Sequence, residues 1–217
     1  TYETGIKALD NNNAIYEAST NTCRKGIDAG TLTLFIGQSG SGKTTAALNI
    51  AGNIVRPIKD AIVIHLDFER ASKDSRVQSM LKFSDEEMKT KYKRYDSEIS
   101  SEKFYALCKI IHKSKMTAYD EIKQDTGVKD ANGKPFYELP PTIIILDSIA
   151  TMYSDGTNAE EEMAGQMSTT AEAKLNNQII KRLVASSILE QANIMIFAIN
   201  HITTKIDINP MQKTPSA

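Results

Sequence analysis

Cysteine is scarce in this chain of 217 residues, and long apolar runs are missing. The two cysteines, Cys23 and Cys108, lie far apart without metal-ligand spacing, which argues against a disulfide framework and predicts free thiols in a reducing compartment. No apolar run approaches the ~20 residues that a membrane-spanning helix needs, and no charged and then apolar leader opens the chain. The sequence therefore predicts a cytoplasmic protein, in the host cytoplasm if it is viral, with no membrane partner.

Neither sign of charge is in excess. The 26 Lys and Arg residues nearly balance the 27 Asp and Glu residues, for a formal net charge of −1 at pH 7. Because the chain has no overall basic excess, its net charge does not indicate nucleic-acid binding. Any nucleic-acid site must therefore be local or be supplied by an assembly. The length suits one domain, and the 41% hydrophobic and 24% charged residues are typical of a folded one.

Short runs rich in Ile and Val alternate with helical patterns along the chain. This alternation predicts an α/β fold with a mostly parallel twisted sheet flanked by helices. The expected strands are residues 32–36, 61–66, 142–146 and 194–199. Because each run is nearly continuous in apolar residues, we expect these strands to be buried on both faces. Helices are expected at residues 44–55 and 158–191, the second with a core stripe at helical spacing. The stripe consists of Met163, Met167, Ala171, Leu175, Ile179, Leu183 and Ile188.

Residues 71–141 have a different composition, which is charged and rich in lysine. We expect a mainly helical elaboration inserted between two core strands, with a turn at Asn132-Gly133 and a capping box that starts at Ser84. Two interpretations remain open. The region is either a solvated helical excursion or a partner-binding or DNA-facing appendage. The cations of such an appendage would be Lys89, Lys91, Lys93 and Arg94.

One motif indicates a specific chemistry. Residues 37–44, GQSGSGKT, match G-x-x-x-x-G-K-[ST] at every fixed position, follow an expected strand and open an expected helix. Glycines suit such a loop because backbone N–H groups wrap a phosphate, and the helix N-terminus adds partial positive charge. Lys43 is expected to reach the β- and γ-phosphates of ATP, and the Thr44 hydroxyl to hold Mg²⁺. The expected nucleotide-binding residues are Gly37, Gln38, Ser39, Gly40, Ser41, Gly42, Lys43, Thr44 and Thr45.

A carboxylate on a neighbouring strand would complete a site for Mg²⁺ and a nucleotide. Asp147 follows the apolar run 142–146 at the carboxyl edge of the expected sheet, where α/β proteins bind ligands. Such a carboxylate is otherwise often a helix cap. Beside the nucleotide motif, Asp147 is the expected second metal ligand, with Thr44.

Hydrolysis also needs a group that orients or polarises water. Asp67 and Glu69 follow the expected strand 61–66 and point to the same side if its alternation continues. From the residues alone, the simpler interpretation is a solvated pair of strand-end acids that pairs with Arg70 or Lys73. The alternative is a carboxylate poised over the γ-phosphate.

The fourth apolar run ends in the polar pair Asn200-His201. In isolation, this pair is typical of a turn entry, with Asn200 capping and His201 solvated. With the phosphate motif and Asp147 on neighbouring strand ends, however, the pair is expected at the same edge of the sheet.

The order of these motifs resembles the core of RecA-type recombinases, and most closely the phage UvsX-type recombinases, whose fourth strand likewise ends in Asn-His. The motifs are Thr4-Gly5-Ile6-Lys7-Ala8-Leu9-Asp10, Gly26, Gly30, residues 37–44, Asp67-x-Glu69, Asp147-Ser148 and Asn200-His201. The resemblance covers about residues 4–205, apart from insertions at 11–24 and in most of 71–141. It implies a RecA-like P-loop NTPase core that is incomplete at both ends of these 217 residues.

The resemblance also implies roles that the motifs alone leave open. Glu69 would be the catalytic carboxylate that polarises water, acting with Lys43, and His201 would sense the γ-phosphate and signal to a DNA-binding loop. Single-stranded DNA would contact two candidate loops, residues 154–164 and 202–217. Subunits would associate as a filament or a ring.

We therefore expect a Mg-ATP-dependent, DNA-dependent recombinase-like ATPase that forms a filament on single-stranded DNA and promotes homologous pairing and strand exchange. Two alternatives remain open. One is a RecA-fold ATPase with another role, such as a ring helicase or a recombination accessory protein, and the other is an ATP-gated assembly module with little turnover. A small-molecule kinase is disfavoured because the chain shows no evident arginine-rich lid for a second phosphorylated substrate.

Overall fold

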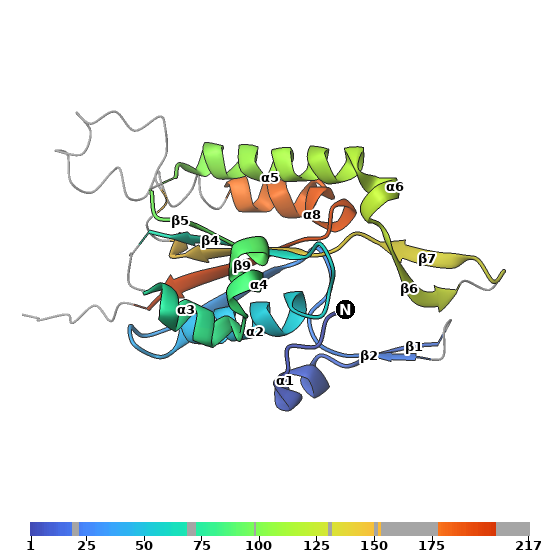
Figure 1. Cartoon of the computed structure of the whole chain (residues 1–217), viewed down its shortest axis with the longest axis horizontal. Helices are drawn as coiled ribbons and strands as arrows, with labels where there is room; N and C mark the ends of the chain where they lie inside the picture. The colour runs from blue at the N-terminus through green and yellow to red at the C-terminus, as the bar shows by residue number, and fades with distance from the viewer. Residues whose placement is uncertain are drawn as a thin grey trace, which may run out of the picture.

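The computed structural model describes residues 1–18, 22–68, 73–97, 99–129, 132–149, 152 and 178–202. In this part of the chain, a five-stranded parallel sheet lies between two layers of helices (Figure 1). Two small antiparallel sheets, β1-β2 and β6-β7, lie at one end of the molecule. The predicted class, α/β with a parallel sheet flanked by helices, is confirmed.

The order of strands in the main sheet is β3-β9-β8-β4-β5, and all neighbours are parallel. Their bounds are β3 Leu32–Gly37, β4 Ile62–Asp67, β5 Tyr92–Tyr95, β8 Thr142–Asp147 and β9 Ile194–His201. The four predicted strands are therefore confirmed, and each extends past its predicted carboxyl end. β5 was not predicted. The smaller sheets consist of β1 Ile15–Glu17, β2 Thr22–Arg24, β6 Gln124–Lys129 and β7 Pro135–Glu138.

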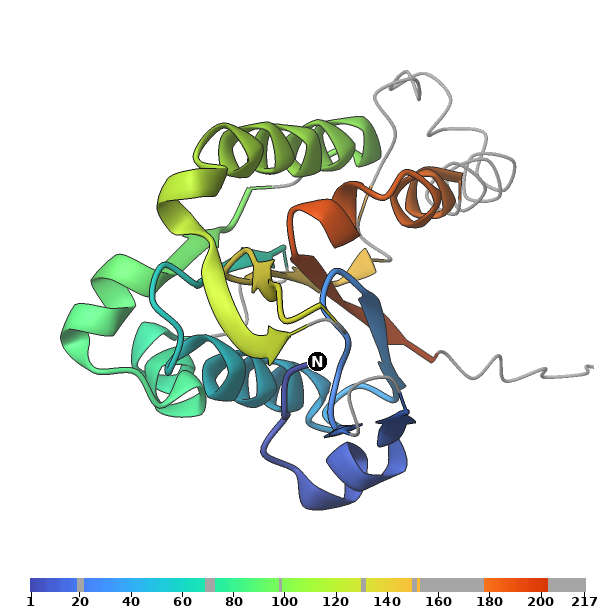
Figure 2. The same ribbon diagram turned by 90° about the vertical axis from the view of Figure 1, so that its right-hand side faces the viewer.

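Alternate residues of the central strands divide between two cores, one on each face of the sheet. Figure 2 shows the helices on the two faces. Ile143 and Ile145 pack in the core formed with α2, α3 and α4. Ile144 and Leu146 pack in the core formed with α5, residues 178–185 and α8. The bounds are α2 Lys43–Val55, α3 Asp74–Leu81, α4 Asp85–Lys91, α5 Ser101–Thr117 and α8 Ile188–Gln191. Two short helices, α1 Lys7–Asn12 and α6 Tyr119–Ile122, lie outside these layers.

Strand β3 departs from the predicted burial. It is an edge strand, and its side chains Leu34 and Ile36 are 45% and 56% exposed. The expectation that all four strands are buried on both faces is therefore wrong for β3. An apolar run alone does not reveal whether helices cover both faces of the strand that it forms.

The inserted region belongs to the folded core. It is mainly helical. It connects β4 to β8, and these two strands are neighbours in the sheet. It also adds the edge strand β5, and its side chains Val77, Leu81, Phe104 and Cys108 are fully buried. The interpretation as a solvated excursion is therefore wrong, because these residues complete both cores. Asn132 and Gly133 lie in the connection between β6 and β7.

Local signals within the insertion behave as predicted. At the N-terminus of α4, the Ser84 hydroxyl accepts a hydrogen bond from Glu87 N at 3.2 Å, and Ser84 N donates to Glu87 Oε2 at 2.8 Å. This reciprocal pair is the predicted capping box. It also lowers the pKa of Glu87, because the carboxylate accepts the backbone hydrogen bond of Ser84.

Three of the four cations suggested for the appendage contact the protein itself. The Lys91 ammonium donates to three carbonyl oxygens at and after the end of α2, those of Val55, Arg56 and Ile58, at 2.6–3.1 Å. A cation at this position satisfies carbonyls that the helix leaves unpaired and complements the helix dipole. Lys93 Nζ donates to Lys89 O at 3.1 Å. Arg94 forms ion pairs with Asp67 and Asp74.

The predicted long helix at 158–191 is interrupted. Residues 178–185 are helical, but the chain turns at 186–187 before α8 begins. Ser187 has φ 53°, a left-handed conformation that a continuous α-helix excludes. Ile179 and Leu183 are buried, as the core stripe predicts, and Ile188 packs against the same core. The rest of the stripe, from Met163 to Leu175, lies outside the described residues.

Both cysteines are free thiols, as predicted. Cys23 is exposed, whereas Cys108 is buried in α5, and this burial raises the pKa of the Cys108 thiol to about 12. Among the helices of the described ranges, none combines the length and apolar character needed to cross a membrane.

His65 is a fully buried base on β4. Its Nδ1 lies 2.9 Å from the Tyr92 hydroxyl, and its Nε2 has no hydrogen-bond partner among the described residues. Burial lowers the pKa of His65 to about 4, and the nearby Arg94 charge adds to the lowering while Asp67 opposes it. The imidazole is therefore neutral in the folded protein at neutral pH.

We predict a loss of stability in acid that originates at His65. Because the unfolded imidazole takes up a proton near its ordinary pKa of 6.5 and the folded one only near 4, stability falls as the pH drops through this window. The slope is at most about 1.4 kcal/mol per pH unit. Urea unfolding between pH 4 and 6.5 should show a flatter dependence for His65→Phe than for the wild type. The control His112→Gln, at a half-buried histidine, should keep the wild-type slope, and equal slopes for His65→Phe and the wild type would contradict the prediction.

Candidate nucleotide-binding site

The glycine-rich loop joins the end of β3 to the start of α2. β3 ends at Gly37, residues 38–42 are exposed, and α2 begins at Lys43. Gly40 and Gly42 have φ values of 73° and 85°, in the left-handed region that favours glycine. Gly42 is the N-cap residue and supplies no side-chain cap, so the first N–H groups of α2 face the loop. Such a loop before a helix N-terminus can bind a phosphate.

The Lys43 side chain folds over this loop. Its ammonium donates hydrogen bonds to Gln38 O at 2.7 Å and to Gly37 O at 3.0 Å. Two carbonyl oxygens therefore hold the cation above the loop, and a phosphate oxygen there could replace either one. This placement agrees with the phosphate-contacting role predicted for Lys43.

Thr44 and Asp147 meet although 103 positions separate them in the sequence. The Thr44 hydroxyl donates to Asp147 Oδ2 at 2.7 Å. Asp147 is the last residue of β8 and is buried, and Thr44 lies in the first turn of α2. The structure therefore brings together the two predicted metal ligands.

His201 lies at the same edge of the sheet. Strand β9 runs between β3 and β8 and continues through Asn200 to His201, which is the register partner of Gly37. Ile202 N then donates to Gly37 O at 3.1 Å. The interpretation of Asn200-His201 as a turn entry is therefore wrong, because the strand and its hydrogen bonds extend to the first residue of the phosphate motif.

The structure describes only one of the two acids predicted at the end of β4. Asp67 ends the strand with only 1% of its side chain exposed, and its Oδ2 lies 2.7 Å from Arg94 Nη2. The solvated interpretation is wrong for Asp67, and the described partner is Arg94, not Lys73. Glu69 lies outside the described residues, so its catalytic role stays a prediction.

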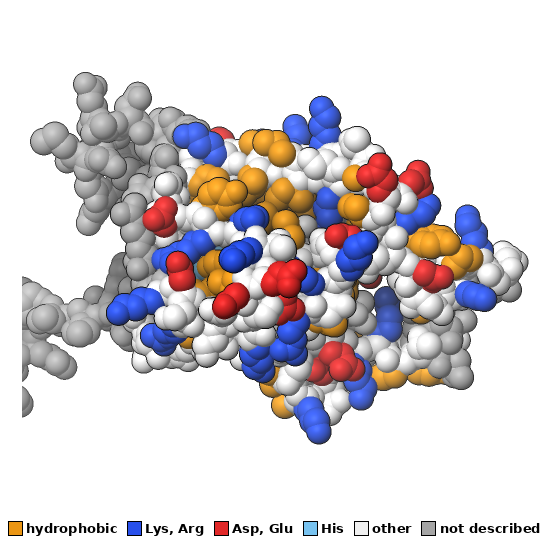
Figure 3. Space-filling view, viewed as in Figure 1, with side chains coloured by type: hydrophobic (Ala, Val, Ile, Leu, Met, Phe, Trp, Pro, Cys, Tyr) orange, Lys and Arg blue, Asp and Glu red, His pale blue; other side chains and the backbone are white. Residues whose placement is uncertain are grey.

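The predicted DNA contacts also stay untested. Residues 154–164 lie outside the described ranges, and Ile202, which is 53% exposed, is the only residue of 202–217 within them. On the face shown in Figure 3, Lys and Arg side chains are interspersed with Asp and Glu. This face therefore offers no broad patch of one sign.

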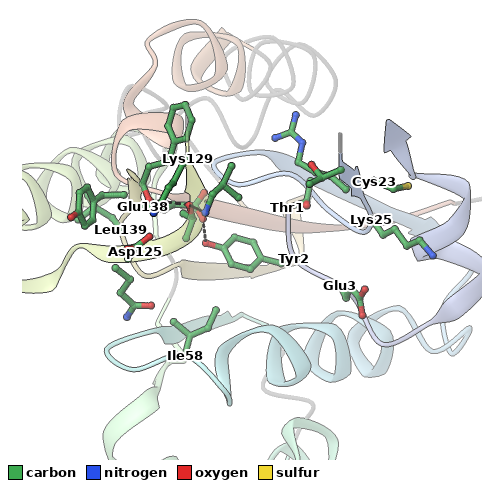
Figure 4. Close-up of a pocket in the computed structure, with 17 residues that line it drawn as sticks. Thr1, Tyr2, Glu3, Cys23, Lys25, Ile58, Asp125, Lys129, Glu138 and Leu139 are labelled. Carbon is green, nitrogen blue, oxygen red and sulfur yellow. Dashed lines mark hydrogen bonds between the residues drawn. The ribbon is translucent and has the colours of Figure 1, made fainter. Parts of the chain in front are cut away.

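The described residues also form a cavity of about 790 Å³ between the β1-β2 and β6-β7 sheets (Figure 4). On its wall, the Tyr2 hydroxyl donates to Glu138 Oε2 at 2.9 Å and accepts from Asn193 Nδ2 at 2.5 Å. The cavity holds none of the predicted site residues, and its wall carries acids and cations in similar number. We therefore take the carboxyl edge of the sheet, where the motif residues meet, as the candidate site.

No cluster of three or more His, Cys, Asp or Glu side chains suited to a metal ion occurs among the described residues. A Thr44-Asp147 pair suits Mg²⁺ nonetheless, because Mg²⁺ at nucleotide sites takes few protein ligands and completes its shell with phosphates and water. No protein-family model and no curated protein sequence matches this chain. The functional assignment therefore rests on the motif residues and their placement.

Two cations, Arg94 and Lys115, make structural contacts near the sheet that the sequence did not predict. Arg94 was grouped with surface lysines but pairs with Asp67 beside the site. Lys115 on α5 is buried, and its ammonium donates to the carbonyl oxygens of Pro140 at 2.5 Å and Ala192 at 2.7 Å. For Arg94, the signal was its spacing of two from Tyr92, which places both side chains on the same face of β5. For Lys115, the signal was its helical position on the buried face of α5.

Proposed function

We propose that this protein is a Mg-ATP-dependent, DNA-dependent ATPase with a RecA-like P-loop core, which forms a filament on single-stranded DNA and promotes homologous pairing and strand exchange. The observation that carries the proposal is the 2.7 Å contact between the Thr44 hydroxyl and Asp147. A hydroxyl at the start of a helix and a carboxylate on a separate strand, beside a loop of the G-x-x-x-x-G-K-[ST] type, are the parts that P-loop NTPases use to hold Mg²⁺.

The chain's own residues support nucleotide binding in a definite arrangement. Loop residues 37–42 and the α2 N-terminus would wrap the phosphates with N–H groups, and Lys43 would contact the β- and γ-phosphate oxygens. Thr44 and Asp147 would hold Mg²⁺, which supplies positive charge that neutralises the phosphate oxygens. Thr45, the next residue of α2, would lie against the same phosphates.

The step from ATPase to recombinase is supported by His201. His201 is the last residue of β9 and the register partner of Gly37. The chain therefore leaves the sheet toward the second candidate DNA loop beside the phosphate motif. A γ-phosphate contact at His201 would then alter the path of residues 202–217. ATP would favour the DNA-bound filament by binding that state more tightly, and hydrolysis would release it. The proposed water-polarising residue is Glu69.

We predict that single-stranded DNA stimulates ATP hydrolysis and that His201→Ala removes the stimulation. The experiment measures ATP turnover and DNA binding, with and without DNA, for the wild type, His201→Ala and the control His112→Ala. We expect His201→Ala to bind ATP but to hydrolyse it at the DNA-independent rate, whereas His112→Ala behaves as the wild type.

Two results would contradict the proposal. If DNA leaves the wild-type rate unchanged and no DNA complex forms with ATP, the recombinase function is wrong. If ATP binds and changes assembly without turnover, the protein is an ATP-gated assembly module instead.

A further inference from the structure

The cavity between the β1-β2 and β6-β7 sheets has walls of opposite charge. Residues 22–25 form one wall, which includes Arg24 and Lys25 but no acid. The facing wall, from β6 and β7, carries Asp125 and Glu138 and a single lysine. Figure 4 shows these two acids on one side of the cavity and Lys25 on the other. A ligand with negative charge at one end and hydrogen-bond donors at the other would complement both walls.

Tyr2 connects the two walls. Tyr2 N donates to Ile27 O at 2.8 Å, and Ile27 N donates to Tyr2 O at 2.9 Å, just after the wall formed by residues 22–25. The Tyr2 hydroxyl donates to Glu138 Oε2 on the facing wall at 2.9 Å. Burial raises the pKa of Tyr2, so this hydroxyl keeps its proton at neutral pH. The cavity is therefore preformed, which lowers the cost of ordering the protein when a ligand binds.

The polar groups of the walls can still bind a ligand. Glu138 Oε2 accepts from Tyr2, and Asp125 Oδ1 accepts from a backbone N–H at 2.8 Å. Each carboxylate has a second oxygen that can accept a further hydrogen bond. Within the described ranges, Lys25 and Lys129 take part in no hydrogen bond or ion pair. Cations and acceptors are therefore both available to a ligand.

Two aromatic side chains also line the cavity. Phe136 and Tyr137 of β7 are 50% and 45% exposed. The Lys123 ammonium lies 5.1 Å from the centroid of the Tyr137 ring, whereas Phe136 makes no ring contact in the described part of the chain. Aromatic rings beside cations are the parts on which proteins stack the bases and hold the phosphates of single-stranded nucleic acid. Phe136 is the ring available for stacking.

We propose that this cavity binds a nucleotide whose base carries an exocyclic amino group, either a free nucleotide or a unit of single-stranded DNA. The base stacks on Phe136, and its amino group donates to Glu138, as the amino group of cytosine does to carboxylates. The phosphate contacts Arg24 and Lys25. The volume of about 790 Å³ is in the range of small-molecule sites. None of residues 37–45 lines the cavity, so the inference does not rest on the proposed ATP site.

The test uses Cys23 as a local reporter. Cys23 is exposed on the cavity wall, whereas Cys108 is buried and its thiol has a pKa of about 12, so a thiol reagent should modify Cys23 alone. Saturating dCMP or a short deoxycytidine oligonucleotide should slow this modification severalfold, also in Lys43→Ala, which disables the proposed ATP site. Slowing by dCMP indicates a site for free nucleotides, and slowing by the oligonucleotide alone indicates a site for a DNA strand.

One pair of variants tests the stacking contact. Phe136→Ala should weaken nucleotide binding about tenfold or more, because a base loses its aromatic partner. The control Tyr95→Ala removes an exposed aromatic side chain from β5, outside the cavity, and should keep the wild-type Kd.

A second set of variants tests the polar contacts. The wild type should bind dCMP severalfold more tightly than dTMP, which has no amino group. Glu138→Gln should remove this preference, because the amide keeps an acceptor for Tyr2 but replaces the second oxygen with a donor. Lys25→Gln should lower the slope of log Kd against log salt for the oligonucleotide by about 0.7, whereas Lys82→Gln, at an exposed lysine after α3, should not.

Four results would overturn the inference. If neither dCMP nor the oligonucleotide slows the modification of Cys23, the cavity is not a nucleotide site, and slowing by a short peptide of mixed charge would then identify a peptide groove. If Phe136→Ala binds as tightly as Tyr95→Ala, no base stacks there. If dTMP binds as tightly as dCMP, Glu138 recognises no amino group. None of these results affects the proposed function, which fails separately if the wild type does not hydrolyse ATP.

Discussion

Replacing Lys43 with alanine is expected to lower kcat/KM for ATP hydrolysis by about 100-fold or more, the range observed when one preorganised donor to a developing charge is removed. The Lys43 ammonium is the cation that the loop holds directly above its own backbone, through Gly37 O and Gln38 O. Its loss leaves the loop with N–H donors but no charge to oppose the γ-phosphate. Steady-state ATPase assays and titration with a fluorescent ATP analogue would measure the effect.

The matched control for this prediction is Lys113→Ala, which removes an exposed lysine from α5 on the opposite face of the sheet. It should leave hydrolysis unchanged. Urea unfolding should show that Lys43→Ala folds normally, because the loop carbonyls that it releases can turn to water. ATP binding and turnover at wild-type levels in Lys43→Ala would show that the glycine-rich loop is not the nucleotide site.

Replacing Lys115 with methionine is expected to destabilise the folded protein by about 2–4 kcal/mol at pH 8. Methionine matches the length and shape of the lysine stem but leaves the buried carbonyl oxygens of Pro140 and Ala192 without their donor, and an unsatisfied buried acceptor costs about 1–3 kcal/mol. Pro140 precedes β8 and Ala192 precedes β9. Lys115 therefore connects α5 by hydrogen bonds to the amino ends of both central strands. Urea unfolding would measure the difference.

The contribution of Lys115 should also increase with pH. Burial lowers the pKa of this amine to about 7 from its ordinary value of 10.5, and a neutral amine still has two hydrogens for its two close carbonyls. Between pH 7 and 10.5 the unfolded chain holds a proton that the folded chain has released, so stability rises with pH, by at most about 1.4 kcal/mol per unit. Below pH 7 both states are protonated, and the contribution is smallest.

Measurements between pH 7 and 9 test this effect with a matched pair of variants. Lys115→Met should lose the rise of stability with pH, whereas Lys113→Met, on the exposed side of the same helix, should retain it. A wild-type stability that is flat over this window would show that Lys115 stays charged in the folded protein.

Several elements of the fold followed from local pattern. The apolar runs at 32–36, 61–66, 142–146 and 194–199 are strands because side chains that are hydrophobic on both sides suit a sheet covered by helices. β5 escaped notice because its four residues, YKRY, carry two cations and too few positions for a periodicity to emerge. The order of strands and the exposed face of β3 also could not be predicted, since no local pattern states which elements become neighbours.

The candidate site divides in the same way. Residues 37–44 and Asp147 were named from the sequence because phosphate and metal chemistry restrict which residue types can serve and where on a strand they lie. The role expected of His201 came from the resemblance to RecA-type recombinases. The contact of Thr44 with Asp147 agrees with that prediction. The ion pairs of Arg94 and the carbonyl contacts of Lys115 could not be predicted, because no motif states which groups these cations meet once the chain is folded.

By itself, the sequence determined the class of fold, the strands that carry the motif residues, and the chemical types expected at their ends. Those features depend on hydrophobic periodicity and on residue chemistry, both of which are local. Only the tertiary structure decided that β9 lies between β3 and β8, that the insertion completes both cores, and that Arg94 bridges the two ends of the β4-α3 connection. These features depend on long-range packing. A buried charge must be paired or hydrogen-bonded, and only the folded sheet determines which groups lie close enough to do so.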